Sequence, residues 1–229
     1  MMDFSPRNRE VFKMPLTAAN AGADATLPAS WAASLVEEKS CAGGSGAFRE
    51  EHRTVSVYAT NFVRKSDGAG GQWHLLDDLG LAGSSLVLGE PGRAESFSSP
   101  EHRSGAPWVE YEFSTASEEN ATLRLSLLPV FPVDSEHRQR FAVQIDGQSP
   151  RTLDMSGAGE WKENSAPTWS ANVLRNAAIQ TVEVGRLKPG WHTLRLIDID
   201  PGLIFEAWTL TFPGAPPAYP LPPETRCGR

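Results

Sequence analysis

Cysteine, clusters of basic residues and long apolar runs are scarce or missing in this 229-residue sequence. The two cysteines, Cys41 and Cys227, have no neighbours at zinc-ligand spacing, so we expect unpaired thiols, with a disulfide between them as the alternative. The net charge is -7 and no Lys/Arg cluster occurs, which argues against nucleic acid and charged lipid as partners. No segment approaches ~20 apolar residues, so the sequence predicts no membrane span.

Motifs for targeting and for independent catalysis are also missing. Residues 1–6 lack the apolar run and the small-residue cleavage site of a signal peptide, so the location of the protein is not indicated. The sequence has no Gly-x-Ser-x-Gly elbow and no histidine pair at metal-ligand spacing, and its glycine-rich stretch at 43–46 lacks the lysine of a P-loop. We therefore expect no independent enzymatic activity.

Turn residues and alternating segments are what the sequence does contain. Its 20 glycines and 18 prolines separate short segments in which apolar and polar residues alternate. A period of two places one face of a strand in a core and the other in solvent. The predicted strands are 54–59, 84–88, 108–113, 123–127, 141–145, 152–155, 179–184, 191–199 and 203–212. So many short strands with little helix predict an all-β fold, an antiparallel β-sandwich or jelly roll.

Composition divides the chain into three parts. Residues 1–52 are rich in small and polar residues with one short helix predicted at 30–38, and we interpret them as a poorly structured linker or the remnant of a preceding domain. Residues 53–213 hold the predicted sandwich. Residues 214–229 are proline-rich, which is typical of an extended tail.

Short motifs along the predicted sandwich occur in a recognisable order. They are Val55-Ser56-Val57, Phe62-Val63-Arg64-Lys65, Trp73 with Leu79-Gly80 and Gly83, Val109-Glu110-Tyr111-Glu112-Phe113, Arg140-Phe141-Ala142-Val143, Trp169 with Val173 and Asn176, His192-Thr193-Leu194, Asp200-Pro201-Gly202 and Pro222-Pro223-Glu224. No single motif is specific. Their order and spacing from about residue 53 to residue 225 resemble the C-terminal domain of glycoside hydrolase family 115, whose members are xylan α-glucuronidases.

The resemblance implies a galactose-binding-like sandwich that accompanies a catalytic region upstream, so no catalytic residue is carried over. It implies a non-catalytic accessory domain that packs against a catalytic domain or a second protomer. The alternative is a carbohydrate-binding module for xylan or glucuronoxylan, plant cell-wall polysaccharides. We expect no cofactor. A structural calcium stays open, although Tyr58 and Thr60 stand where the resemblance leads us to expect acidic residues.

Tryptophans are the candidate ligand-binding residues, because an aromatic face suits a sugar ring as well as a core. Trp161 lies in the polar segment 157–164, where stacking on a ligand competes with packing over a sheet edge or domain interface. Trp169 and Trp73 are further candidates, with a structural role as the alternative. Trp208 shares one face with Leu210 and is predicted to be core, whereas Trp108 and Trp191, which begin strands, are expected in the core or at its rim.

Two carboxylates and one histidine complete the set. Asp198 and Asp200 lie two residues apart at a strand end and could supply oxygen ligands to calcium. The alternative is a plain turn, since Asp200-Pro201-Gly202 is itself a turn signature. His192 follows the turn residues Pro189 and Gly190, which favours a polar turn role over that of a general base.

Overall fold

The computed structural model describes residues 47–69, 71–87, 96–133, 137–155, 167–218 and 221–226. The predictions made for residues 1–46, including the helix at 30–38 and the poorly structured N-terminal segment, lie outside these ranges. So do those for Cys41, Cys227 and Trp161.

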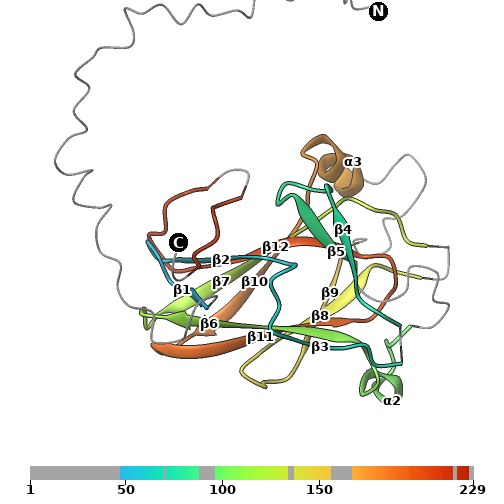
Figure 1. The fold of residues 1–229 in the computed structure, drawn as a ribbon, viewed down its shortest axis with the longest axis horizontal. Coiled ribbons are helices and arrows are strands. Elements are labelled where there is room, and N and C mark those ends of the chain that lie inside the picture. The colour runs from blue at the N-terminus through green and yellow to red at the C-terminus, as the bar shows by residue number, and fades with distance from the viewer. Residues whose placement is uncertain are drawn as a thin grey trace, which may run out of the picture. The chain divides into compact units, whose positions relative to one another are not determined.

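Two six-stranded sheets form the domain and appear as a lower and an upper layer in Figure 1. Sheet A has the order β1-β6-β11-β8-β9, with β3 also paired to β6. Its strands are β1 (Phe48–Arg49), β3 (Arg64–Ser66), β6 (Trp108–Thr115), β8 (Arg140–Ile145), β9 (Arg151–Asp154) and β11 (Gly190–Asp198). Every described pairing within it is antiparallel except that of β1 with β6.

Sheet B has the order β10-β7-β12-β5-β4, with β2 also paired to β12, and all its described pairings are antiparallel. Its strands are β2 (Thr54–Tyr58), β4 (His74–Asp77), β5 (Ser84–Val87), β7 (Asn120–Leu127), β10 (Ala178–Arg186) and β12 (Ile204–Thr211). The two stacked sheets confirm the predicted antiparallel β-sandwich.

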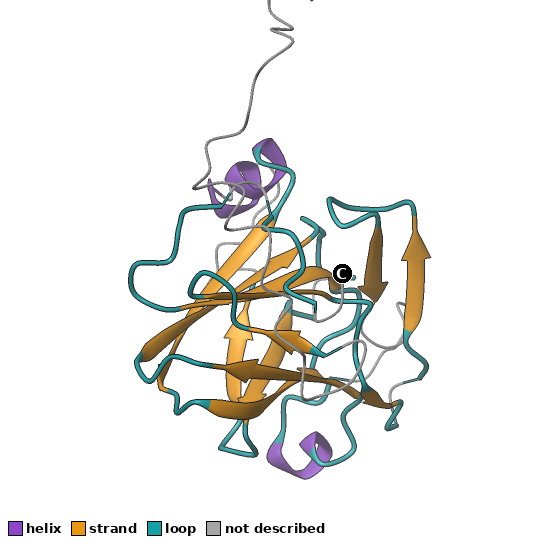
Figure 2. Cartoon of the chain, turned by 60° about the vertical axis from the view of Figure 1, so that its left-hand side comes forward, coloured by secondary structure: helices purple, strands orange, loops and turns teal. Residues whose placement is uncertain are grey.

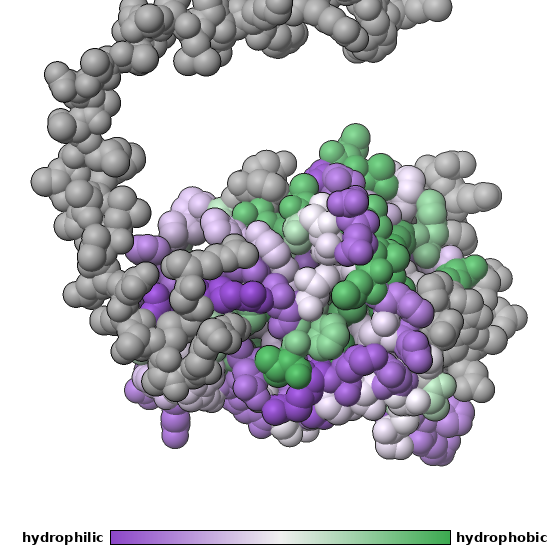
Figure 3. Space-filling model, in the orientation of Figure 1, coloured by the Kyte–Doolittle hydropathy of each residue, from purple (hydrophilic) through white to green (hydrophobic). Residues whose placement is uncertain are grey.

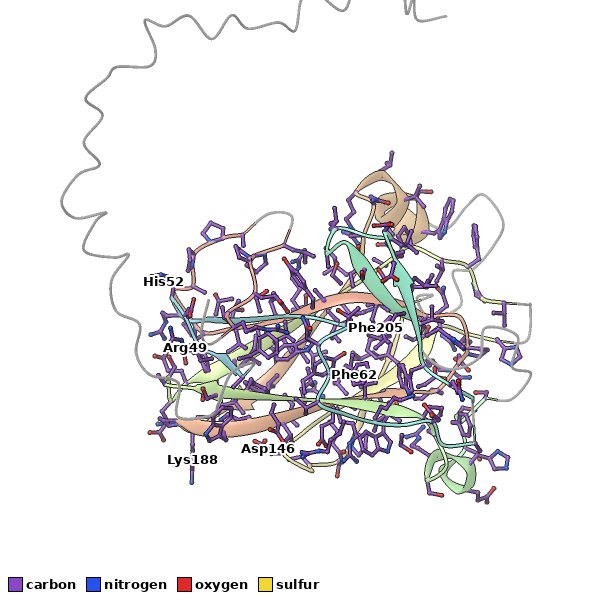
Figure 4. The ribbon with its side chains drawn as sticks, viewed as in Figure 1. Arg49, His52, Phe62, Asp146, Lys188 and Phe205 are labelled. Atoms are coloured by element: carbon purple, nitrogen blue, oxygen red, sulfur yellow. The ribbon has the colours of Figure 1, made fainter. Side chains whose placement is uncertain are left out.

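Strand alternation places the core between the two sheets. In β6 the odd-numbered residues Val109, Tyr111 and Phe113 are completely buried. Trp208 of β12 meets the rings of Tyr111 and Phe113 edge to face, at centroid distances of 5.6 and 5.3 Å. The predicted core position of Trp208 is therefore confirmed, and burying each such ring contributes about 1.5–3 kcal/mol. Figure 4 labels Phe205, another ring of this core, between the layers.

The short elements were not predicted. Strands β1, β3 and β4 have two to four residues each, and their sequences show no alternation of apolar and polar residues. Helices α2 (Pro100–Arg103) and α3 (Pro167–Leu174) lie outside the two sheets in Figure 2. α2 begins after Ser99, whose Oγ accepts a hydrogen bond from the amide of His102. Within the described ranges, no helix is both long enough and apolar enough to cross a membrane.

Residues on both sides of 53–213 take part in the sandwich. Phe48 is 1% exposed, and it pairs with Arg226 across an isolated bridge. Thr225 is also buried, and its carbonyl accepts a hydrogen bond from the amide of Arg49 at 3.0 Å. Its own amide donates to the carbonyl of Ser56 at 3.1 Å. Parts of the predicted linker and tail thus join the edges of the two sheets, while the boundaries at 52 and 213 stay predictions.

A buried carboxylate anchors the loop between β4 and β5. Glu206 is fully buried, and its Oε1 accepts a hydrogen bond from the amide of Leu81 at 2.7 Å. Its Oε2 accepts another from the hydroxyl of Ser126 at 3.0 Å. Gly80 has φ +86°, and a Cβ there would lie 2.5 Å from Glu206 Oε1. The loop therefore needs glycine at position 80 for both backbone conformation and space.

Candidate functional site

Trp73 is a core residue in the structure. It is 8% exposed and packs in the main hydrophobic cluster, just before β4. Its indole Nε1 donates a hydrogen bond to the carbonyl of Ser66 at 3.0 Å, which fixes the ring between the ends of β3 and β4. The predicted ligand-binding role would require this ring to leave the core.

Trp169 lies in α3 and is covered by a second aromatic ring. Phe131 stacks on it at a centroid distance of 4.5 Å, with 22° between the ring planes. The indole Nε1 is buried and has no hydrogen-bond partner among the described residues, and it lies beside a small cavity of about 20 Å³ whose lining includes Gln139 and Asn172. That volume suits one water molecule rather than a sugar ring. The proposed binding role of Trp169 stays a prediction.

The two candidate calcium ligands, Asp198 and Asp200, are buried, and both carboxylate oxygens of Asp200 already accept hydrogen bonds. Its Oδ2 accepts hydrogen bonds from the backbone amide and Nε of Arg140, at 3.0 and 2.7 Å. Its Oδ1 accepts from Arg140 Nη2 and Ser96 Oγ, at 3.0 and 2.7 Å. Asp198 is equally buried, but no group of three or more His, Cys, Asp or Glu residues in the described ranges could hold a metal. A calcium ion bound by Asp200 would therefore have to displace Arg140.

His192 is enclosed by partners on both ring nitrogens. Its Nδ1 lies 2.7 Å from Asp146 Oδ2, and its Nε2 lies 2.7 Å from the carbonyl of Lys188 and 3.1 Å from Thr115 Oγ1. The residue is only 8% exposed. An aspartate, a histidine and a hydroxyl in this order resemble a nucleophilic triad, but Thr115 Oγ1 itself donates to the carbonyl of Lys188 at 3.0 Å. These hydrogen bonds connect β11 to the end of β6 and to the turn after β8.

An exposed tryptophan lies on the outer face of sheet A. Trp191 is 51% exposed, which differs from the core or rim position expected for it. In β11 the even positions His192, Leu194 and Leu196 are buried, so Trp191 and the other odd positions point away from the core. The same alternation is visible in the sequence, and it could have identified Trp191 as an outward residue.

Next to Trp191 the outer face of sheet A carries a charged network. Glu110 of β6 accepts hydrogen bonds from Arg64 Nε at 2.7 Å and from Arg195 Nη2 at 2.7 Å. Arg64 Nη2 also reaches Glu112 at 2.8 Å. Burial alone would raise the pKa of the Glu110 carboxyl, but the hydrogen bonds and charges of Arg64 and Arg195 outweigh burial and hold that pKa below its ordinary value.

Half-buried Trp108 closes the other end of this network. The guanidinium of Arg195 lies 4.0 Å above the centre of the Trp108 ring, a cation–π geometry. Trp108 packs against a second, smaller hydrophobic cluster made by Phe97, Ala106, Ala142, Ile197 and Ile199. Residues 96–107 therefore cover one end of the outer face of sheet A, and Trp191 lies towards the other.

The family model of the glycosyl hydrolase family 115 C-terminal domain matches residues 47–224, more than half of the chain. A search of curated proteins finds no match.

Three solved structures resemble the fold. A family 115 4-O-methyl-α-glucuronidase with specificity for decorated arabinogalactans is 20% identical over 65% of this chain, with a TM-score of 0.46. The chain spans 17% of the length of that enzyme. The C-terminal family 6 carbohydrate-binding module of a Zobellia galactanivorans laminarinase is 14% identical over 69% of this chain and 99% of its own, with a TM-score of 0.42. A family 35 module from Clostridium thermocellum is 10% identical over 69% and 96%, also at 0.42.

Proposed function

Because the chain belongs to the glycosyl hydrolase family 115 C-terminal domains, we propose that it acts as a non-catalytic accessory domain packed against the catalytic domain of an α-glucuronidase-like enzyme. The resemblance noted in the sequence carries the same expectation, with a second protomer as the other partner. The side chains of His192 and Asp200 are buried and bound to other residues of the domain, which supports a structural rather than a catalytic role for them.

Exposed apolar side chains on sheet B and α3 are the single observation that carries this proposal. On the β4–β5 hairpin, Leu75, Leu79 and Leu81 are 56%, 39% and 43% exposed. On α3, Val173 and Leu174 are 41% and 88% exposed. Figure 3 shows hydrophobic surface over both elements. We call these five residues the apolar surface. Leaving such groups in water is unfavourable, and contiguous exposed apolar area marks interaction sites.

The test uses the chain and the catalytic region of a family 115 enzyme, produced as separate polypeptides and mixed before size-exclusion chromatography with light scattering. We expect co-elution of the two polypeptides. The double substitution Leu79→Ser with Leu81→Ser should abolish co-elution, because it replaces two apolar side chains of the contact surface with polar ones. It should leave the core intact, because both leucine side chains are exposed. Val63→Ser is the matched control, since this side chain is 48% exposed and its backbone pairs with Glu110 of sheet A, away from the apolar surface.

A wild-type chain that forms a homodimer sensitive to the same double substitution would support packing on a second protomer. A chain that stays monomeric and associates with neither partner would overturn the proposal.

Carbohydrate binding is the second candidate function. The observation that favours it is the exposed Trp191, because an indole face open to solvent on a rigid sheet can stack on a sugar ring. Plant xylan or glucuronoxylan is the ligand that the sequence resemblance implies.

A further inference from the structure

The outer face of sheet A carries three rows of side chains that meet across two strands. In the register of β11 with β6, Trp191 lies opposite Ser114, Thr193 opposite Glu112 and Arg195 opposite Glu110. Opposite residues on one face have Cβ atoms about 4.5–5.5 Å apart. Successive rows are about 6.6 Å apart along the strands. These six residues form a continuous band, which we call the Trp191 lane.

Trp191 supplies the aromatic part of the lane. Its neighbours along and across the sheet, Thr193 and Ser114, are short and half-buried, so neither is large enough to cover the indole. The lane lies on β6 and β11 of sheet A, whereas the apolar surface lies on α3 and on the β4–β5 hairpin of sheet B, so the two surfaces belong to different elements. Figure 4 labels Lys188, three residues before Trp191 in the sequence, at the lower left of the domain. An exposed indole with hydroxyl groups beside it suits a ring that has apolar C–H groups and polar substituents.

The charged part of the lane is held rigid and keeps hydrogen-bonding capacity. Glu110 binds Nε and Nη2 of Arg195, at 3.1 and 2.7 Å, so within the described ranges Nη1 remains available as a donor. Glu112 uses Oε1 for its ion pair with Arg64, and its side chain is 42% exposed, so Oε2 is available as an acceptor as far as the described residues go. Groups already fixed by other contacts lose little conformational entropy when they bind a ligand.

The charges of this network balance. Arg64 and Arg195 carry two positive charges, and Glu110 and Glu112 carry two negative charges. A network without net charge gives little attraction to a uronic acid and suits the hydroxyl groups of an uncharged sugar. We propose that the Trp191 lane binds an uncharged polysaccharide of pyranose rings, such as a xylan backbone, with one ring stacked on Trp191 and neighbouring hydroxyls bound by Thr193, Glu112 and Arg195. This inference deepens the second candidate function and rests on it, but not on packing against a catalytic domain.

Affinity electrophoresis and calorimetry of the full chain with soluble unsubstituted xylan and with glucuronoxylan test the lane. The wild-type chain should bind both to a similar degree, and binding should change by less than about twofold on adding salt, since exposed unpaired charges are not involved. Trp191→Ala should weaken binding at least about tenfold, the effect of losing one good contact. Leu75→Ala, which removes an exposed apolar side chain from β4 in the other sheet, should bind like wild type.

Glu112→Ala provides a second variant that keeps Trp191. It should weaken binding while leaving the circular dichroism spectrum unchanged, because Glu112 is half-exposed. Binding by Trp191→Ala equal to that of wild type would overturn the lane. So would a salt-sensitive preference for glucuronoxylan. A chain that associates with a catalytic region but binds neither polysaccharide would overturn the lane and the second candidate function together, and would leave the accessory role standing.

Discussion

Arg140 and Asp200 form a bidentate ion pair in which the carboxylate is fully buried: Nε lies 2.7 Å from Oδ2 and Nη2 lies 3.0 Å from Oδ1. The amide of Asp200 also donates to the carbonyl of Arg140 at 2.9 Å. The pair thus joins the start of β8 to the turn that precedes β12, next to the cluster that covers one end of sheet A.

Removing one member of this pair should destabilise the domain strongly. Arg140→Ala leaves the Asp200 carboxylate buried without its cation, and we expect a loss of about 3–5 kcal/mol in the free energy of unfolding. Urea denaturation followed by tryptophan fluorescence measures it. Arg186→Ala is the control, because its pair with Glu118 is exposed and should contribute less than about 1 kcal/mol. Equal losses in the two variants would contradict a structural role for the buried pair.

Metal removal should leave stability unchanged. Because Arg140 and Ser96 already occupy both oxygens of Asp200, a calcium ion has no ready site at this turn. We expect the midpoint of thermal unfolding to be the same, within about 1 °C, in excess chelator and in millimolar calcium, since a ligand that binds only the folded state would raise it. A midpoint that rises with calcium concentration would contradict this prediction.

Substitution of Gly80 should be far more costly than substitution of a nearby glycine. A Cβ at position 80 would lie 2.5 Å from Glu206 Oε1 and 2.7 Å from Ser85 Oγ, and the backbone has φ +86°. Gly83 has almost the same φ, +83°, with nothing within 4 Å of its Cβ position. We expect Gly83→Ala to cost about 1–2 kcal/mol from backbone strain alone. Chemical denaturation should show a clearly larger loss for Gly80→Ala, and a ranking in the opposite order would show that the loop is not held by Glu206.

The Glu110 network should make stability depend on pH. The pKa of Glu110 is lower in the folded chain than its ordinary value of 4.5, so folding favours the carboxylate. Its stabilisation is complete above about pH 5, and is lost as the pH falls through the lowered pKa. The difference in unfolding free energy between wild type and Glu110→Gln, on the order of 1 kcal/mol, should therefore shrink as the pH falls below about 4.5. Denaturation at several pH values measures it, and a difference that grows in acid would contradict the assigned direction.

Alternation in the long strands made most of the fold predictable. β6, β7, β8 and β11 have six to nine residues each, and their core-facing residues follow the odd or even positions visible in the sequence. The short strands β3 and β4 were missed because their sequences, Arg-Lys-Ser and His-Leu-Leu-Asp, show no alternation of apolar and polar residues. The burial of Phe48 was missed because it depends on pairing with β6 and Arg226, residues distant in the chain.

The candidate site was less predictable than the fold. Trp73 and Trp191 are both isolated tryptophans near strand starts, yet one is buried and the other half-exposed. The exposure of Trp191 follows from its odd-numbered position in β11, which can be read from the sequence. The burial of Trp73 depends on where the chain between β3 and β4 turns inward, which cannot. The occupation of Asp200 by Arg140 depends on two segments 60 residues apart, so local spacing could not separate an ion pair from a calcium ligand.

The bridge between Phe48 and Arg226 brings the two ends of the described sandwich side by side. Neighbouring ends allow a domain to be joined into a loop of another protein with little distortion, and allow its chain to be re-ordered by linking the old ends and opening a new pair elsewhere. Any polypeptide attached at residue 47 or residue 226 would emerge from this one corner. A host protein joined at both of these residues would therefore be attached to the sandwich at a single corner.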